Sequence, residues 1–330
     1  MIDINSLRIF SVDKYNNKIG VFIVPTGVGA SIGGFAGDAA SWARKLSKKC
    51  KLIVNPNVVN AACFSGINEN MLYVEGYSLD EFFREKCNLV PSENNKIGIV
   101  FDKSISQRVL NVHINTINAV KTVYGIDIVG YEITKNPVGV SFYIDNSGAS
   151  MGDVQDLETI KEAAQCLLER GADSIAIVCS FPEDDGDDYA NGIGVDPVGG
   201  VEAIISHYIS KELKVPCAHA PAFENIQIST DIVDPRCAAE YITPTFLPCI
   251  LIGLSQAPKI SLSGGINIKD VDFLVMPYNS LGGIPVFEMS KLNKPIYAIK
   301  ENSTVLDVTS SNLNIKAKVL ESYEDLFNVI

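Results

Sequence analysis

The residues best placed to do chemistry surround His219, which is one of only three histidines in the chain. His219 stands in the sequence VPCAHAPAF, two residues after Cys217, and Pro221 ends the predicted strand just beyond it. Side chains alternate along a strand, so Cys217 and His219 are expected on one side of a sheet. A thiol beside an imidazole could serve as nucleophile and base, although a buried structural histidine fits the same pattern. We take His219 as the candidate acid–base group and Cys217 as a second catalytic candidate.

Carboxylates lie shortly before this strand, in FPEDDGDDYANGIGVDPVGGVEAIISH. The acidic run at 183–188 could hold a hard cation, but its spacing matches no EF-hand, and such runs are usually solvated loops. No metal is therefore assigned, although binding at this run stays open. Asp196 precedes a predicted helix and is interpreted either as the group that orients His219 or as a simple helix cap. Glu202, in the first turn, has the same simple explanation.

A glycine-rich loop follows the first predicted strand, in VFIVPTGVGASIGGFAGDAASWARKL. Glycine lets the backbone turn sharply and approach a ligand closely. The helix after the loop offers free N–H groups and a positive dipole end, which together favour an anion. The sequence therefore predicts an anion-binding loop, and the alternative is a tight turn that only packs.

Two further loops follow strands that the pattern predicts. Asn55, Asn57 and Asn60 offer neutral donors and acceptors, although asparagine also commonly fills turns and helix caps. Gly282–Gly283 repeat the strand–glycine–helix arrangement, and Glu288 stands where fold relatives hold a ribose hydroxyl, an argument by analogy alone. The candidate substrate-binding residues are Gly27, Gly29, Ser31, Gly33, Gly34, Asn55, Asn57, Asn60, Gly199, Gly200, Gly282, Gly283 and Glu288.

Two familiar nucleotide motifs fail at the first loop. The dinucleotide fingerprint GxGxxG needs a third glycine where the chain has Ile32, and the following strand ends in Asn55 instead of an acidic residue. A phosphate-binding P-loop would need lysine where the chain has Phe35. NAD and P-loop nucleotide binding are therefore disfavoured, and the sequence assigns no cofactor.

Predicted strands and helices alternate along the whole chain. This order predicts an α/β protein with mostly parallel sheets. We expect two Rossmann-like lobes, residues 1–145 and 146–330, whose glycine-rich strand-to-helix loops face a shared cleft. The alternative is one continuous domain.

Composition limits the possible partners and compartment. The 330-residue chain has a net charge of −12, which argues against nucleic acid and anionic membranes as partners. No stretch reads as a signal peptide or membrane helix, so a cytoplasmic protein is expected. The eight cysteines form no CxxC pair and are expected to be mostly buried reduced thiols. A small molecule is the expected partner, and a homo-oligomer is possible.

Several motifs together resemble a bacterial family of unknown function, domain-of-unknown-function family 3326. These motifs are TGVGASIGGFAGDA, NPNVVNA, LYVEGYSLD, GVDPVGGVEAIISH, PCAHAPAF and TFLPCILIGLSQAP. The resemblance covers nearly the whole chain and implies a shared fold and site, but it supplies no reaction.

The hypothesis from sequence is a cytoplasmic enzyme that binds a small anionic or nucleotide-like metabolite between the lobes. General acid–base catalysis of a transferase or lyase reaction is favoured over redox chemistry, because no dinucleotide motif survives. Two alternatives stay open: a regulatory protein that binds a metabolite without converting it, and a metal-assisted hydrolase.

Overall fold

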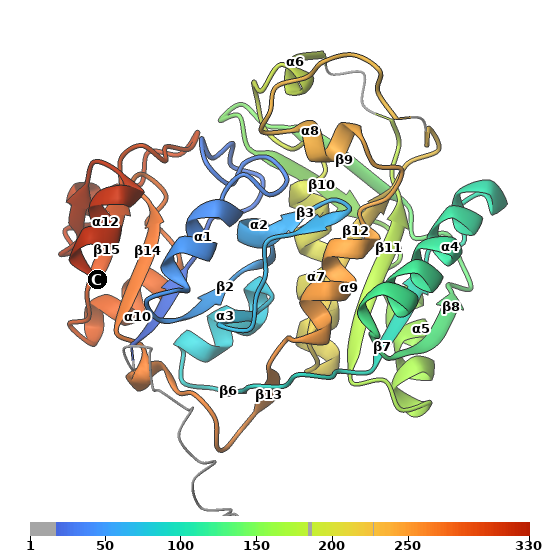
Figure 1. The fold of residues 1–330 in the computed structure, drawn as a ribbon, viewed down its shortest axis with the longest axis horizontal. Coiled ribbons are helices and arrows are strands. Elements are labelled where there is room, and N and C mark those ends of the chain that lie inside the picture. Colours follow the sequence, from blue (N-terminus) through green and yellow to red (C-terminus); the bar gives the residue numbers. More distant parts are fainter. Residues whose placement is uncertain (1–17, 184–186, 227) are drawn as a thin grey trace, which may run out of the picture.

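Two parallel sheets organise the computed structural model, which describes residues 18–183, 187–226 and 228–330 (Figure 1). Within these residues the larger sheet has six strands, in the order β16 (Lys318–Leu320), β15 (Ile296–Ile299), β14 (Phe273–Pro277), β1 (Ile19–Phe22), β2 (Lys51–Val54) and β5 (Met71–Tyr73). The smaller sheet has the order β12 (Cys217–Ala222), β11 (Ser174–Ser180), β7 (Ile97–Phe101) and β8 (Ile128–Ile133). Every neighbouring pair in both sheets is parallel.

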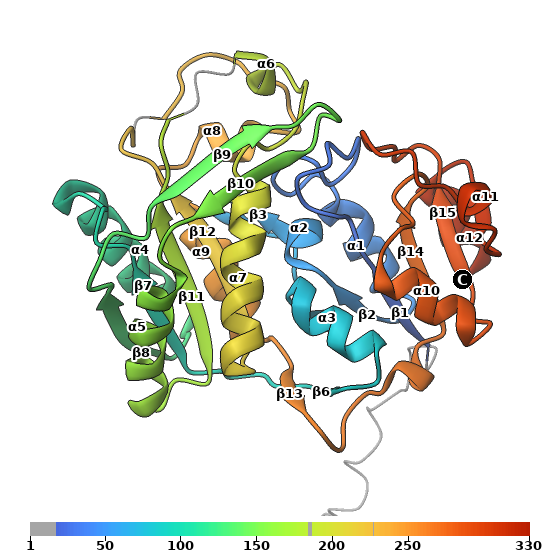
Figure 2. The same cartoon turned by 180° about the vertical axis from the view of Figure 1, so that it is seen from behind.

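Helices cover both faces of the two sheets. The helices of the first half are α1 (Ala40–Leu46), α2 (Pro56–Val59), α3 (Gly76–Phe83), α4 (Gln107–Tyr124) and α5 (Leu157–Glu169). Those of the second half are α6 (Asp187–Ala190), α7 (Gly199–Leu213), α8 (Ala238–Tyr241), α9 (Leu247–Ser255), the 3-10 helix η2 (Ile268–Asp270), α10 (Ile284–Lys291), α11 (Ser310–Leu313) and α12 (Tyr323–Val329). Figures 1 and 2 show α7 standing between the two sheets, beside α3.

The central strands are buried on both faces. Strand β7 (IGIVF) is buried at every position, and β11 (SIAIVCS) at all but its last. Continuous apolar runs of this kind are typical of parallel strands covered by helices on each side. One hydrophobic cluster includes residues of both sheets and of α9, so the core is shared between them. Helices α5 and α7 belong to a separate cluster on the other face of the smaller sheet.

Three short antiparallel pairs complete the described strands. They are β9 (Val140–Ile144) with β10 (Ser150–Val154), β6 (Asn88–Val90) with β13 (Lys259–Ser261), and β3 (Asn60–Ala61) with β4 (Phe64–Ser65). The β9–β10 pair packs on α7. It therefore lies over the helix that carries Glu202.

The structure confirms a mixed α/β fold with mostly parallel sheets. The sheets do not follow the division at residue 145, because the larger one joins strands from both ends of the chain. The boundary between two domains at residue 145 therefore remains a prediction, and it does not coincide with the division of the strands into two sheets. None of the helices in the described residues is both long and apolar enough to span a membrane.

Candidate functional site

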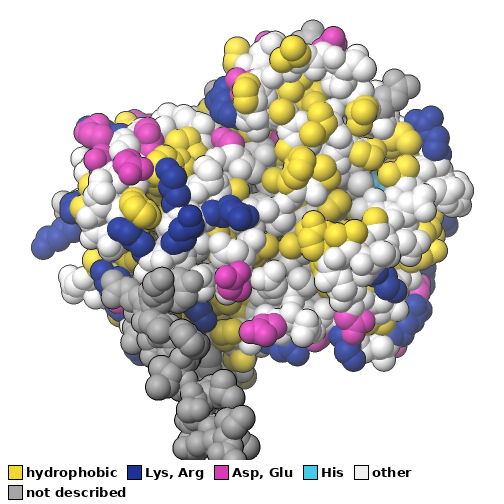
Figure 3. All heavy atoms as spheres, in the orientation of Figure 1, with side chains coloured by type: hydrophobic (Ala, Val, Ile, Leu, Met, Phe, Trp, Pro, Cys, Tyr) yellow, Lys and Arg dark blue, Asp and Glu magenta, His cyan; other side chains and the backbone are white. Residues whose placement is uncertain are grey.

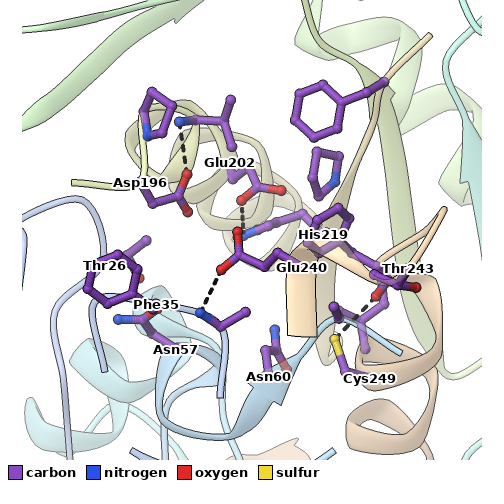
Figure 4. A pocket seen from close by; sticks show the side chains of 18 of the residues that line it. Thr26, Phe35, Asn57, Asn60, Asp196, Glu202, His219, Glu240, Thr243 and Cys249 are labelled. Carbon is purple, nitrogen blue, oxygen red and sulfur yellow. Dashed lines mark hydrogen bonds and ion pairs between the residues drawn. The ribbon is translucent and has the colours of Figure 1, made fainter. Parts of the chain in front are cut away.

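A cavity of about 630 Å³ lies at the carboxyl ends of strands from both sheets. Its lining includes residues that follow β1, β2, β5, β11 and β12, together with α7 and the segment from 228 to 250. Ligands of parallel α/β proteins bind at such strand ends, and a cavity of this size suits a small molecule. Figure 4 shows acidic side chains and His219 converging on one region of it.

Glu202 and His219 form the centre of this group. The imidazole Nε2 of His219 lies 3.6 Å from the Glu202 Oε2, and its Nδ1 lies 2.9 Å from the Ser206 hydroxyl. Glu202 and Ser206 are four residues apart on α7, so one helix face presents both to β12. Glu202 is only 7% exposed, and its Oε1 has no hydrogen-bond partner among the described residues.

Asp196 and Glu240 complete the acidic group. The Val198 N–H, at the start of α7, donates to Asp196 Oδ1 at 3.1 Å. Glu240 Oε1 accepts from the Ala36 N–H at 2.7 Å and from the Tyr189 hydroxyl at 2.8 Å. Asp196 therefore bonds the turn that leads into α7, while the partners of His219 are Glu202 and Ser206.

Burial separates the proton affinities of these groups. It raises the pKa of Asp196 to about 6 and, with the charge of Asp196, that of Glu240 to about 8. Burial and the two neighbouring carboxylates also raise the pKa of Glu202 well above its usual range. The pKa of His219 falls to about 3, first through burial and then through the charge of His207. At neutral pH the site thus holds an ionised Asp196, a protonated Glu240 and a neutral imidazole, and Glu202 keeps its proton to a higher pH than an exposed glutamate does.

A second carboxylate–imidazole pair lines the same cavity. His207 Nε2 lies 3.0 Å from Glu75 Oε1, and the other carboxylate oxygen of Glu75 accepts from the first N–H groups of α3. Burial lowers the pKa of His207, but the hydrogen bond and charge of Glu75 outweigh it and leave the pKa raised. A Cβ at Gly76 would lie 2.6 Å from the His207 ring nitrogen, so glycine is needed for this contact.

The raised pKa of Glu240 predicts a loss of stability with rising pH. Between about pH 6.5 and about pH 8 the unfolded chain has lost a proton that folded Glu240 retains, so the free energy of unfolding falls. Glu240→Gln should remove on the order of 2 kcal/mol of this fall, as measured by urea unfolding across that range. Glu212→Gln, at an exposed position of α7, should leave the slope unchanged. An unaltered slope in the Glu240 variant would contradict this assignment.

The three predicted asparagines all line the cavity, but much of their hydrogen bonding is internal. Asn55 bonds both the N–H and the carbonyl of Val24, at 3.1 and 2.8 Å. Asn57 donates to the Gly33 carbonyl at 2.7 Å, and Asn60 accepts from the Tyr73 hydroxyl at 3.1 Å. Their amides therefore hold the first loop and β5 in place beside the cavity.

The first glycine loop is bound mainly by the protein itself. The Gly33 N–H donates to Asp38 at 2.7 Å, and Ser31 pairs with Ser303. Of the predicted loop residues, Gly34 lines the cavity, whereas Gly27, Gly29, Ser31 and Gly33 are not part of its described lining. The carboxylate of Glu240 already occupies the Ala36 N–H, which is where an anion would have been expected.

The other predicted glycines serve packing or lie elsewhere. A Cβ at Gly200 would lie 2.3 Å from the Ser150 carbonyl oxygen, and one at Gly199 would lie 2.9 Å from Thr26, so both allow α7 to begin close to its neighbours. Gly282 and Gly283 precede α10 and are not part of the described cavity lining. Glu288, also outside it, pairs with Lys291 at 2.7 Å.

Cys217 faces α7, as His219 does, but the two do not form a reactive pair. Its thiol lies near Ser210, one turn along α7 from the Ser206 that contacts His219. Two residues along a strand span roughly 7 Å, beyond hydrogen-bond reach. Burial raises the pKa of the Cys217 thiol well above its ordinary value. The protonated thiol is a poor nucleophile.

The acidic run is only partly described. Positions 184–186 lie outside the described residues, and Glu183 accepts from the Asn225 N–H at 2.8 Å. Within the part of the chain that the structure covers, no three His, Cys, Asp or Glu side chains are arranged to hold a metal ion.

Sequence reasoning missed Glu202 as a functional group and did not consider Glu240. The four-residue spacing of Glu202 and Ser206, close to Asp196, was a usable signal for Glu202. Glu240 gave none, because its place depends on how the segment after β12 folds back over the cavity.

Comparisons with known proteins place the chain in a family. A family model described as "Protein of unknown function (DUF3326)" matches residues 19–330. The chain belongs to this family. A relative of this DUF3326 member is an uncharacterized lipoprotein of a Synechococcus strain, 37% identical over 313 residues, which cover 92% of this chain and 87% of the relative. No solved structure matches the chain.

The relative's name contradicts one prediction, the cytoplasmic location. The prediction was wrong because composition and hydropathy detect segments that span a membrane, whereas a lipoprotein is held by a covalently attached lipid. Acidic charge and short apolar runs are compatible with such an attachment. The compartment of this DUF3326 member therefore cannot be derived from its composition.

Proposed function

We propose that this protein is an enzyme that transfers protons to and from a small substrate in the cavity. The observation that carries the proposal is the buried cluster of Asp196, Glu202, Glu240 and His219, whose pKa values are driven apart by a common environment. Titratable groups with separated pKa values in one cavity are the usual arrangement of paired acids and bases.

The geometry suggests a role for each group. Ionised Asp196 can accept a proton, and protonated Glu240 can donate one, near neutral pH. Glu202 can exchange a proton with the substrate, since its Oε1 has no hydrogen-bond partner among the described residues. His219, neutral and held by Ser206, positions Glu202. This replaces His219 as the principal proton carrier, because burial keeps its imidazole uncharged.

Proton transfer at a carbon or a leaving group fits lyase or transferase chemistry, as the sequence predicted. The two sheets, with loops facing the cavity, also support the proposal of two Rossmann-like lobes around a shared cleft. The charge of the lining does not support an anionic substrate, since the described cavity residues include no Lys or Arg.

Solvent isotope labelling tests the proposal without knowledge of the substrate. The protein is incubated with a metabolite extract in D₂O, and mass spectrometry follows compounds that gain deuterium or change mass. We expect at least one compound to change with the active protein and not with a Glu202→Gln variant of equal melting temperature. A compound that binds but is never converted would overturn the proposal of an enzyme and would favour a regulatory protein that binds a metabolite.

A further inference from the structure

The lining of the cavity has a one-sided charge. Six carboxylic residues line it, namely Glu75, Glu183, Asp196, Glu202, Asp231 and Glu240. Its two histidines do not balance them, because His219 is neutral and His207 is paired with Glu75. Lysine and arginine side chains gather elsewhere, for example over α1 and α12 at the left of Figure 3. An anion placed in this cavity would meet the ionised Asp196, and the described lining offers it no lysine or arginine.

Glu202 lines the cavity and has one carboxyl oxygen without a partner in the described part of the chain (Figure 4). Its Oε1 is buried and lacks a hydrogen-bond partner among the described residues. A buried polar atom without a partner is costly, so such atoms in native proteins usually have a ligand or water that satisfies them. An N–H donor of a ligand would satisfy Oε1, and a charged donor would form the stronger bond.

Aromatic rings complete the walls. Phe35 and Tyr189 lie with ring centroids 4.9 Å apart, and Phe223 and Phe246 lie 6.3 Å apart. All four line the cavity. Aromatic faces attract cations through the ring quadrupole and also pack well against an aliphatic chain. Carboxylates beside aromatic rings thus favour a small organic cation.

We propose that the substrate of this site is an amine, whose ammonium group donates to Glu202 Oε1 beside Asp196 and whose carbon chain packs on the aromatic walls. That the bound amine is converted rests on the proposed function, but the binding of an amine can be measured independently. A positive charge beside the cluster favours the ionised carboxyl groups, because it opposes the repulsion that keeps them protonated. Binding of an amine should therefore release protons.

Calorimetry with matched probes tests the inference. Butane-1,4-diamine, butane-1,4-diol and succinate share four carbons and differ in charge, so they report the charge preference of the cavity. At about pH 7 only the diamine should bind measurably, with release of on the order of one proton, found by repeating the titration in buffers of different ionisation enthalpy. Its affinity should rise between about pH 6 and about pH 8 as the carboxyl groups ionise.

Variants on one helix provide the control. Glu202→Gln should weaken diamine binding by about tenfold to a hundredfold, whereas Glu212→Gln, exposed at the end of α7, should not change it. Equal or tighter binding of the diol or succinate, tighter binding of Mg²⁺ than of the diamine, or no binding at all would overturn the inference.

The two proposals fail separately. If the diamine binds with proton release but no compound is converted in the isotope experiment, the proposal of amine binding holds and the proposal of an enzyme fails. If a neutral or anionic compound is converted and this conversion depends on Glu202, the proposal of an enzyme holds and the proposal of an amine substrate fails.

Discussion

Glu202→Gln should lower turnover of the compound found by isotope labelling by about two to four orders of magnitude, the usual contribution of a general acid or base. Glutamine keeps the shape and some hydrogen bonding of glutamate but carries no transferable proton. The Michaelis constant should change far less if Glu202 acts mainly in the transition state. Measurement of kcat and KM for the unaltered protein and for the Glu202→Gln variant shows how much each constant changes.

The pH profile distinguishes this role from a structural one. For the unaltered protein, the rate should rise through about pH 6, where Asp196 ionises, and fall above about pH 8, where Glu240 loses its proton. The titration of His219 should not change the rate near pH 6.5, because burial lowers the pKa of that imidazole to about 3. The control Glu212→Gln should retain full turnover. Equal turnover in the Glu202 variant would show that this carboxyl group is not a proton carrier.

Gly33→Ala should destabilise the protein by about 3 kcal/mol or more, the sum of a backbone cost and a steric one. The residue has a φ of +91°, which L side chains rarely adopt, and an added Cβ would lie 2.8 to 3.0 Å from side-chain atoms of Val24. Val24 is fully buried behind β1 and cannot move freely. Denaturant unfolding of the two proteins measures the loss.

Gly171 provides a matched control for that change. Its φ of +96° is nearly the same, yet an added Cβ there would meet nothing within 4 Å. Gly171→Ala should therefore cost only the backbone part, about 1 to 2 kcal/mol. Equal losses at the two positions would contradict the steric explanation. Because Gly33→Ala is expected to destabilise the fold, that variant does not separate ligand binding by the first loop from stability.

The sequence alone predicted the secondary structure well where the pattern was long. Apolar residues that recur at helical spacing predict a helix over about 106–123, and α4 spans Gln107–Tyr124 between the Ser106 cap and Gly125. The strands of the parallel sheets were also visible as buried apolar runs. After the first glycine loop the same pattern predicts a helix over about 36–48, but α1 begins only at Ala40, since Gly37 adopts a φ of +87° that interrupts a helix.

For the site, the sequence determined which strand ends would carry polar residues, and it singled out His219 and Asp196. Only the tertiary structure decided what those residues contact. Strand order is set by packing between segments far apart in the chain, so no local pattern could show that β14 lies beside β1. The same holds for Glu240, which reaches the Ala36 N–H across more than two hundred positions. The charge state of the site was equally hidden, because the pKa of a carboxyl group depends on its burial and on its neighbours, and both arise only when the chain folds.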